Sequence, residues 1–347
     1  MPHALPARLR EWLQQRSAFA APEGAEARAF VLRALIADGL DRLPPPGAGE
    51  TLARWRALAT VAGHDLALLK LYEGHTDALA ILAEAGADAL SPPGAAWGCW
   101  AAEAPGARVL VTQSEGDGRC RLEGVKAWCS GAEHLDRGLL TAWMPDGRGP
   151  FLAAVDLCQS GVSFDAGGWA AVGMAASDSV DVRFAAVSAQ RVGGAGFYLE
   201  RPGFWQGGAG IAACWHGAST AVAQRMRADA AAREDAGWHR LLALGDVDRV
   251  LGANAALLRE AAAWIDGHPR DDARAWALRT RCAAEAAADH VLRSSARALG
   301  ATPLCRDARH ARLAADLPVF IRQSHGDRDL AALGEAVAAA QEAPWTL

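Results

Sequence analysis

The segment Leu122–Thr141 concentrates the residues best suited to hold a flat organic cofactor. It carries Lys126, Trp128, Ser130 and Gly131 in close order. Alternating polar and apolar residues at its start predict a half-buried strand. Positions two apart in a strand share a face, so Trp128 and Ser130 are expected to face one cavity. An aromatic surface beside a hydroxyl group suits a planar heteroaromatic cofactor, although an ordinary β-hairpin with a buried Trp has the same pattern.

A second candidate for chemistry lies near the C-terminus, where His325 follows Ser324. No Asp or Glu occurs between Leu317 and Gly326, so His325 is the group of this stretch that titrates near neutral pH. Imidazole has a pKa of about 6.5 and can accept a proton at neutral pH. His325 is therefore a group that could act as an acid or a base. The alternative is an exposed residue near the start of a helix.

Length and composition bound the class of protein. The chain has 347 residues, enough for two or three domains, and its formal net charge of −5 gives no indication of nucleic-acid binding. No segment reads as a signal peptide or a membrane span, and seven Cys without a Cys-x-x-Cys pair favour reduced thiols. His64 and His75 lack a convergent third ligand, so no metal site is expected. We expect a cytoplasmic protein that acts on a small molecule.

Hydrophobic periodicity divides the chain into three parts. Apolar residues recur at helical spacing through residues 1–95, and the same spacing returns after residue 192. Between these parts, short runs bounded by turns predict β-strands at Arg108–Thr112, Arg119–Cys129, Gly138–Trp143, Phe151–Leu157 and Ser179–Phe184. The predicted fold class is α+β, with an N-terminal helical domain (1–95), a central antiparallel β-domain (96–192) and a C-terminal helical bundle (193–347).

The third part is expected to build an oligomer as well as a bundle. The apolar stripe Leu244–Ile265 and the Ala-rich run Ala273–Leu299 predict two long packed helices. Gly300 is placed to stop the second of them, and Pro318 is expected to separate two shorter helices. Together the two long helices present more apolar surface than one bundle buries, so a homodimer or a homotetramer is expected.

Several segments resemble motifs of the acyl-CoA dehydrogenase flavoproteins. The Lys-x-Trp-x-Ser-Gly run at residues 126–131 is similar to the family's Lys-x-Trp-Ile-Thr/Ser-Asn/Gly segment. Trp97–Pro105 resembles the flavin-binding strand of the family, Trp169–Ser177 resembles the turn before its last β-strand, and Val192–Phe204 resembles its entry into the bundle. The resemblance extends from about residue 50 to about residue 335 and implies the same order of helices, β-domain and bundle.

The resemblance also implies a bound FAD. The flavin ring would lie against Trp128, with the Ser130 hydroxyl at its reactive edge. The usual flavin-bonding Thr is Ala102 here, but backbone amides at this point do not depend on the side chain. The implied cofactor-binding positions are Ala101, Ala102, Trp128, Ser130, Arg233 and Gly300, and the implied catalytic positions are Ser324 and His325.

Two departures from the family pattern concern the chemistry itself. The carboxylate that removes a proton beside the thioester falls at Ser324, and the place where some members carry it instead falls near Gly207. Neither position is acidic. The segment with which a partner subunit grips FAD reads Arg233-Glu234-Asp235-Ala236-Gly237, and its two added acids should weaken contact with a pyrophosphate.

Three functions follow as hypotheses. The first is an FAD enzyme that oxidises an acyl thioester or a similar small organic substrate. The second is a flavin monooxygenase or oxidase that uses His325 as its acid/base group. The third is a flavin-free binding or scaffold protein of the same fold. A yellow colour of the purified protein separates the first two from the third, and ordinary acyl-CoA dehydrogenation is expected to be slow or absent.

Overall fold

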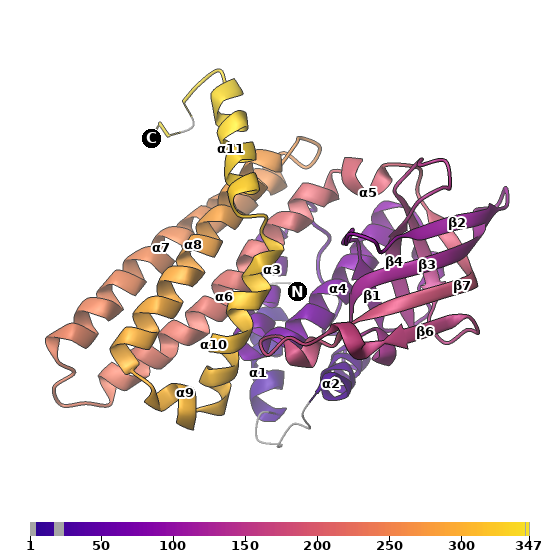
Figure 1. Ribbon diagram of the computed structural model, residues 1–347. Helices are drawn as coiled ribbons and strands as arrows, with labels where there is room; N and C mark the ends of the chain where they lie inside the picture. Colours follow the sequence, from indigo (N-terminus) through magenta and orange to yellow (C-terminus); the bar gives the residue numbers. More distant parts are fainter. Residues whose placement is uncertain (1–4, 17–23, 344, 347) are drawn as a thin grey trace.

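The computed structural model describes residues 5–16, 24–343 and 345–346. The N-terminal part is helical, as the periodicity predicts: α1 (Leu5–Arg16), α2 (Ala25–Ala37), α3 (Thr51–His64) and α4 (Leu66–Glu84). Helix α4 lies between the β-sheet and the C-terminal bundle (Figure 1), where it packs on β1 and on α6.

A buried hydrogen-bond chain fixes α4 against the sheet. The Trp97 amide donates to His75 Nδ1 at 3.2 Å, so the proton of this imidazole is on Nε2, 3.2 Å from Asp41 Oδ2.

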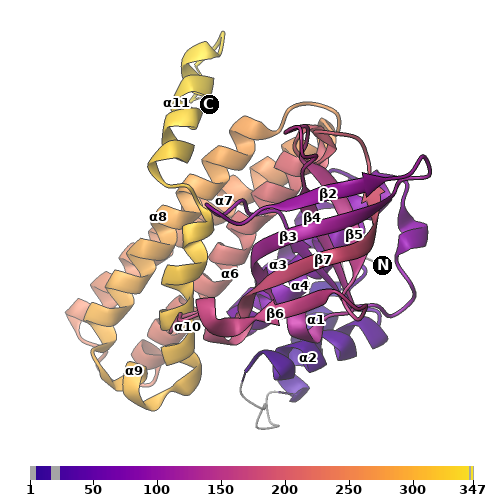
Figure 2. The ribbon, with the colours of Figure 1, turned by 45° about the vertical axis from the view of Figure 1, so that its right-hand side comes forward.

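The central part forms one seven-stranded sheet. Its strands are β1 (Trp97–Trp100), β2 (Val109–Ser114), β3 (Arg119–Ser130), β4 (Arg137–Ala142), β5 (Phe151–Asp156), β6 (Val162–Asp165) and β7 (Ser179–Val192). They follow the order β1-β4-β5-β7-β3-β2, with β6 beside β7 (Figure 2). A parallel bridge from Leu110 to Trp143 returns β2 to the end of β4, which curls the sheet toward a barrel.

The sheet differs from the expected antiparallel one at β1. This strand pairs with β4 in parallel, whereas the other strand pairs are antiparallel. The expectation was wrong here because β1 arrives from α4 and not from a hairpin, so no tight turn sets its direction. Strand β7 also runs beyond Phe184. Ala186 has a positive φ of 53° and interrupts the alternation, after which β7 continues along β5.

The C-terminal part is a bundle built on three long helices, α6 (Gly203–Ala231), α7 (Trp238–Gly267) and α8 (Arg274–Leu299). The short helices α5 (Phe197–Glu200) and α9 (Thr302–Arg306), together with α10 (Ala308–Phe320), the 3-10 turn η6 (Ile321–Gln323) and α11 (Asp327–Ala339), complete it. Pro318 does not itself separate two helices as expected, because α10 continues through it and ends two residues later, at Phe320. Most of the predicted stripe on α7 is buried within the subunit, from Val247 to Ile265. Within the described residues no helix is both long and apolar enough to cross a bilayer.

Helix α10 is attached to the β-domain. The Met174 amide donates to Asp316 Oδ1 at 2.6 Å, and a Cβ at Gly173 would lie 2.8 Å from the carbonyl carbon of Ala315. The loop before β7 can therefore approach α10 this closely only with glycine at this position. Since η6 follows α10 directly, the contact also positions Ser324 relative to the sheet.

Burial of His216 on α6 should make stability depend on pH. Asn254 Nδ2 lies 3.1 Å from His216 Nδ1, and burial, with a smaller effect of Arg259, lowers the pKa of His216 from 6.5 to about 4. Between these values the unfolded chain binds a proton that the folded protein excludes, so stability should fall by about 3 kcal/mol as the pH drops from 6.5 to 4. His216→Asn keeps an acceptor for Asn254 and should flatten this part of the profile in chemical unfolding. An equally steep profile in the variant would contradict the assignment.

Candidate functional site

The loop after β1 offers open backbone donors. Within the described chain, the amides of Ala101 and Ala102 donate no intramolecular hydrogen bond. Ala102 is exposed and Ala101 is partly exposed, so a ligand can reach both. Unpaired amides in a loop can bind the carbonyl oxygens and ring nitrogens of a heteroaromatic cofactor without help from side chains. In both ribbon views this loop lies at the edge of the sheet that faces the bundle (Figures 1 and 2).

An ion pair between a buried lysine and a partly exposed glutamate joins this loop to β3. Lys126 Nζ is 2.9 Å from Glu103 Oε1 and 2.6 Å from Thr141 Oγ1, and the Lys126 side chain is only 1% exposed. Trp143 Nε1 donates to the other oxygen of Glu103 at 3.2 Å. Burial tends to raise the pKa of Glu103, but hydrogen bonds from Thr141 and Lys126 outweigh it and hold the pKa below its usual range. Glu103 therefore holds the loop in place and is a poor proton acceptor.

The strand bulges at Trp128. The pairing of β3 with β7 shifts register between Lys126 and Cys129, and Trp128 has a φ of +60°. The prediction that Trp128 and Ser130 share a face assumed regular alternation along the strand. That assumption is wrong, because a bulge interrupts the alternation between these two residues. The side chains also differ in burial: Trp128 is 54% exposed and Ser130 is 6% exposed. The Ser130 hydroxyl bonds to Ser179 Oγ at 2.7 Å.

These features fit a flavin. An exposed indole stands in a bulge that re-aims it away from the core, and the open amides at Ala101 and Ala102 belong to the loop that the Lys126–Glu103 pair fastens to the same strand. The residues that would hold the ring are thus Trp128 by stacking and the loop amides by hydrogen bonds. A bulge with an exposed aromatic is a costly feature for a fold alone, which is why we read it as a ligand contact.

Truncating the indole should weaken flavin retention. Trp128→Ala is expected to lower flavin affinity by about 1 kcal/mol, which is about fivefold, through loss of a stacking surface. Trp128→Phe should retain most of the affinity, and Phe30→Ala, which removes a large exposed aromatic from α2, should change nothing. The measurement is fluorescence titration of free flavin into deflavinated protein. Equal affinity in Trp128→Ala and the parent protein would defeat the assignment.

His325 and Ser324 lie in the turn between η6 and α11. The His325 side chain is 65% exposed, and its Nδ1 is 3.3 Å from Asp329 Oδ1, while its backbone amide donates to Asp329 Oδ2 at 3.2 Å. Arg281 Nε lies 3.8 Å from Asp329 Oδ2 of the same carboxylate. The pair holds the imidazole proton on Nδ1 and leaves Nε2 as an acceptor. The i, i+4 spacing of His325 and Asp329 is a signal from which sequence reasoning could have found this partner. The Ser324 hydroxyl instead accepts a hydrogen bond from the Gly326 amide at 3.1 Å.

The two remaining predicted positions lie at the other end of the bundle. Arg233 follows α6 and bonds to Asp229 through Nε at 3.2 Å, and Gly300 follows α8 with a φ of 67°. Neither is brought together with Trp128 or His325 within the subunit, so a role in flavin binding requires a second subunit.

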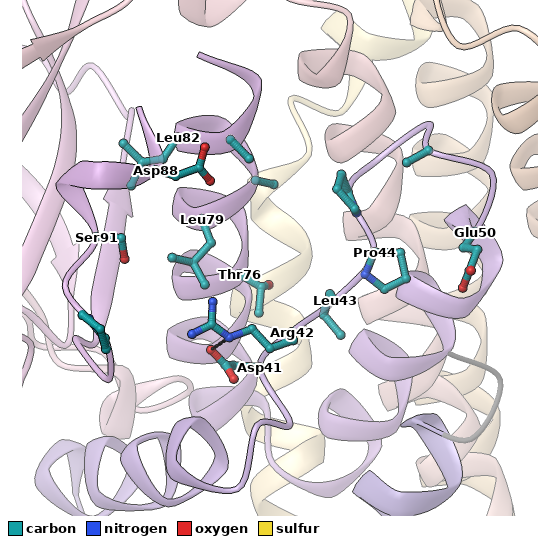
Figure 3. A pocket seen from close by; sticks show the side chains of 15 residues that line it. Asp41, Arg42, Leu43, Pro44, Glu50, Thr76, Leu79, Leu82, Asp88 and Ser91 are labelled. Carbon is teal, nitrogen blue, oxygen red and sulfur yellow. Dashed lines mark ion pairs between the residues drawn. The ribbon is translucent and has the colours of Figure 1, made fainter. Parts of the chain in front are cut away.

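A cavity of about 700 Å³ lies elsewhere (Figure 3). It separates α4 from the loop between α2 and α3, and its walls include Asp41, Arg42, Glu50, Thr76 and Asp88. Arg42 Nε is 3.5 Å from Asp41 Oδ2, as the dashed line marks. None of the predicted site residues lines this cavity. Shape alone therefore does not locate the chemistry in this protein.

The fold is that of the acyl-CoA dehydrogenases, as comparisons with solved structures show. No protein-family model matches the sequence, and no curated protein matches it. Solved structures do match. Dibenzothiophene monooxygenase (TdsC) from Paenibacillus sp. A11-2 has a TM-score of 0.76 at 17% identity, covering 99% of this chain and 98% of that chain.

Two further solved structures share the fold. KijD3, solved with FMN and a dTDP-linked 3-amino-4-keto sugar, has a TM-score of 0.80 at 18% identity, covering 99% of this chain and 95% of that chain. Butyryl-CoA dehydrogenase from Megasphaera elsdenii has a TM-score of 0.77 at 16% identity, covering 97% of this chain and 96% of that chain. TdsC has also been solved with FMN and indole. The agreement of these structures with the present one confirms the predicted fold class.

Proposed function

We propose that this protein is a flavin-dependent oxidoreductase acting on a small organic substrate. The observation that carries the proposal is the exposed Trp128 on β3, the strand to which the Lys126–Glu103 pair fastens a loop of open amides. A bound flavin would supply two-electron redox chemistry at this edge of the sheet. The residues of the chain would bind the ring, orient the substrate and hold or move protons.

Within this class we propose a monooxygenase or an oxidase, in preference to acyl-CoA dehydrogenation. Dehydrogenation of a thioester needs a base at the substrate, yet Ser324 and Gly207 occupy the two positions expected for it. The His325–Asp329 pair instead presents an exposed imidazole whose Nε2 is free to act as a proton acceptor. TdsC, a monooxygenase, and KijD3 share the fold over 99% of this chain.

FMN is the proposed form of the flavin, in place of the FAD that the family resemblance implies. The guanidinium of Arg233 is already bonded to Asp229, and Glu234 and Asp235 add two further negative charges beside it. A second subunit would therefore offer little attraction to the pyrophosphate of FAD. We keep a homodimer or homotetramer as a proposal, since Trp238, Leu241 and Leu242 expose apolar surface at the start of α7.

One purification tests the class and the cofactor. The expected result is a yellow protein that releases FMN on denaturation. A colourless protein that binds neither added FMN nor added FAD would contradict the proposal and favour a flavin-free scaffold.

Turnover separates the chemistries. Oxygen-dependent product formation with reduced FMN is expected for a member of a panel of small polar and aromatic compounds that includes indole and a dTDP-linked 3-amino sugar. Flavin reduction by butyryl-CoA is expected to be slow.

His325→Ala should lower turnover by about 10²–10⁴-fold with flavin still bound, because it removes a general acid/base group. His268→Ala, which alters an exposed imidazole directly after α7, is the matched control. Fast flavin reduction by butyryl-CoA that His325→Ala leaves unchanged would overturn this preference.

A further inference from the structure

The end of strand β3 and the start of strand β7 meet just beyond the bulge. Ser130 pairs with Ser179 in the sheet, and their hydroxyl oxygens lie 2.7 Å apart although the two residues are 49 positions apart in the chain. The Gly131 amide donates to the carbonyl oxygens of Ser177 and Asp178, at 2.9 and 3.0 Å. Two distant segments are therefore held side by side at this point of the fold.

Three side chains with metal-binding atoms converge here. Glu133 and His134 belong to the 3-10 turn η3 (Ala132–His134) that follows β3, and Asp178 directly follows the 3-10 turn η5 (Ala175–Ser177) that precedes β7. One carboxylate oxygen of Glu133, one ring nitrogen of His134 and one carboxylate oxygen of Asp178 all lie within 4.8 Å of one another. Glu133 is exposed and the other two are half-buried, so an ion can reach them from solvent.

These three side chains lack protein partners. In the part of the chain that the structure describes, no hydrogen bond or ion pair joins any of them to another residue. Arg33 on α2 comes near, but its guanidinium donates to both oxygens of Asp136, at 2.8 and 2.9 Å, and to the His134 carbonyl oxygen at 3.0 Å. The carboxylates of Glu133 and Asp178 are thus close together without a cation. Their repulsion is removed when a positive ion binds between them.

One imidazole nitrogen and two carboxylate oxygens are a ligand set for a divalent transition metal ion. Zn²⁺ takes His nitrogen and Asp or Glu oxygen at about 2.0–2.2 Å, and sites with three protein ligands keep a fourth position for water. Ligand atoms around such an ion lie roughly 3.3 Å apart. Atoms already within 4.8 Å of one another reach that spacing through small side-chain rotations. Mg²⁺ and Ca²⁺ prefer sites made of six or more oxygen ligands and fit this set poorly.

We propose that Glu133, His134 and Asp178 form a site for Zn²⁺ or a similar divalent transition metal ion, which joins the end of β3 to the start of β7. The site lies outside the cavity of Figure 3 and does not depend on a bound flavin. Its ligands come from segments far apart in the chain, which is why their spacing in the sequence gives no metal motif. Because the ion needs both segments in place, it binds the folded chain in preference to the unfolded one.

The first experiment measures the ion directly. Protein stripped with EDTA and freed of the chelator is titrated with ZnCl₂ in a calorimeter. We expect one ion per chain with micromolar affinity, and no binding of MgCl₂. Glu133→Gln, His134→Ala and Asp178→Asn should each weaken Zn²⁺ binding about tenfold or more, since each removes a ligand. Asn is chosen at position 178 because it also adopts the positive φ of 43° found there.

Two control variants alter the same residue types on α7. His239→Ala removes an exposed imidazole and Asp248→Asn removes an exposed carboxylate, and both should leave the Zn²⁺ affinity unchanged. Circular dichroism of every variant verifies the fold, so that unfolding is not mistaken for loss of a ligand. Glu133→Gln changes an exposed side chain without a protein partner and therefore tests the site even if another ligand variant fails to fold.

The second experiment asks whether the ion joins the two segments. Hydrogen exchange followed by mass spectrometry compares the protein with and without Zn²⁺. Peptides covering residues 130–136 and 175–181 should both exchange severalfold more slowly with Zn²⁺, because the closed site holds the Gly131 amide on its two acceptors. Peptides from α8 should not change. In Asp178→Asn, Zn²⁺ should leave the exchange of both segments unaltered.

Three results would overturn the proposal. The first is a parent protein that binds no Zn²⁺ even at millimolar concentration. The second is equal Zn²⁺ affinity in the parent and the three ligand variants, which would place the ion elsewhere on the chain. The third is protection of only one of the two segments, which would mean that the ion does not join them. Neither experiment needs flavin or turnover, so a failure of the proposed function leaves this test intact.

Discussion

Replacing Lys126 with Met is expected to destabilise the protein by about 2–3 kcal/mol and to abolish flavin retention. Removing one partner of a buried pair strands the other charge, which costs about 3–5 kcal/mol when both are buried. We lower that figure because the Glu103 side chain is 35% exposed and water screens it. The freed loop would no longer hold the amides of Ala101 and Ala102 against the strand that carries Trp128. Chemical unfolding and flavin content measure the two effects.

The matched variant is Lys126→Met/Glu103→Gln. It removes both charges, so its stability should lie above that of Lys126→Met, and the two effects should not add. Flavin binding should return in part, since Thr141 and Trp143 can still hold an amide at position 103. A double variant less stable than Lys126→Met would show that charge pairing is not what fastens the loop.

Gly217→Ala should also be severe, because α3 and α6 cross at this residue with backbones in contact. A Cβ at position 217 would clash with the Ala59 carbonyl oxygen and lie 2.6 Å from Ala59 Cα. In return, a Cβ at Gly63 on α3 would lie 3.2 Å from the Gly217 carbonyl oxygen. The main chain of one helix must move, so we expect a loss of about 3 kcal/mol, at the upper end for overpacking.

Gly252→Ala on α7 is the control for Gly217→Ala. A Cβ there meets nothing within 4 Å, so the same substitution should stabilise the protein by about 0.5–1 kcal/mol through helix propensity. Chemical unfolding of the two variants should therefore give changes of opposite sign. A mild effect of Gly217→Ala would mean that the crossing of α3 and α6 can open without cost.

Much of the fold was predictable because its signals are local. The predicted strand Arg119–Cys129 matches β3, and Phe151–Leu157 matches β5, since burial of one face imposes alternation on the sequence. The predicted helix Ala273–Leu299 matches α8, and Gly300 ends it with the positive φ that glycine adopts readily. Strand β1 was recognised only through its resemblance to a motif, because four residues carry too little alternation to be read.

The candidate site was harder to predict because its decisive contacts join distant parts of the chain. The Lys126–Glu103 and Trp143–Glu103 contacts each span more than 20 residues, and no periodicity relates their members. The bulge at Trp128 has no local signal either, since the register of β7 creates it. The pairing of His325 with Asp329 is the exception, because both residues lie at the start of one helix.

The parallel pairing of β1 with β4 has a consequence for how the protein assembles. Strand β1 follows the helical part in the chain and is hydrogen-bonded to β4. It also contacts α4, where the Trp97 amide donates to His75. The sheet therefore cannot acquire its full complement of strands until α4 has docked. The helical segment and the sheet should therefore fold and unfold as one cooperative unit. The boundary at residue 95 then marks a change of secondary structure, and the parts on its two sides are not expected to unfold independently.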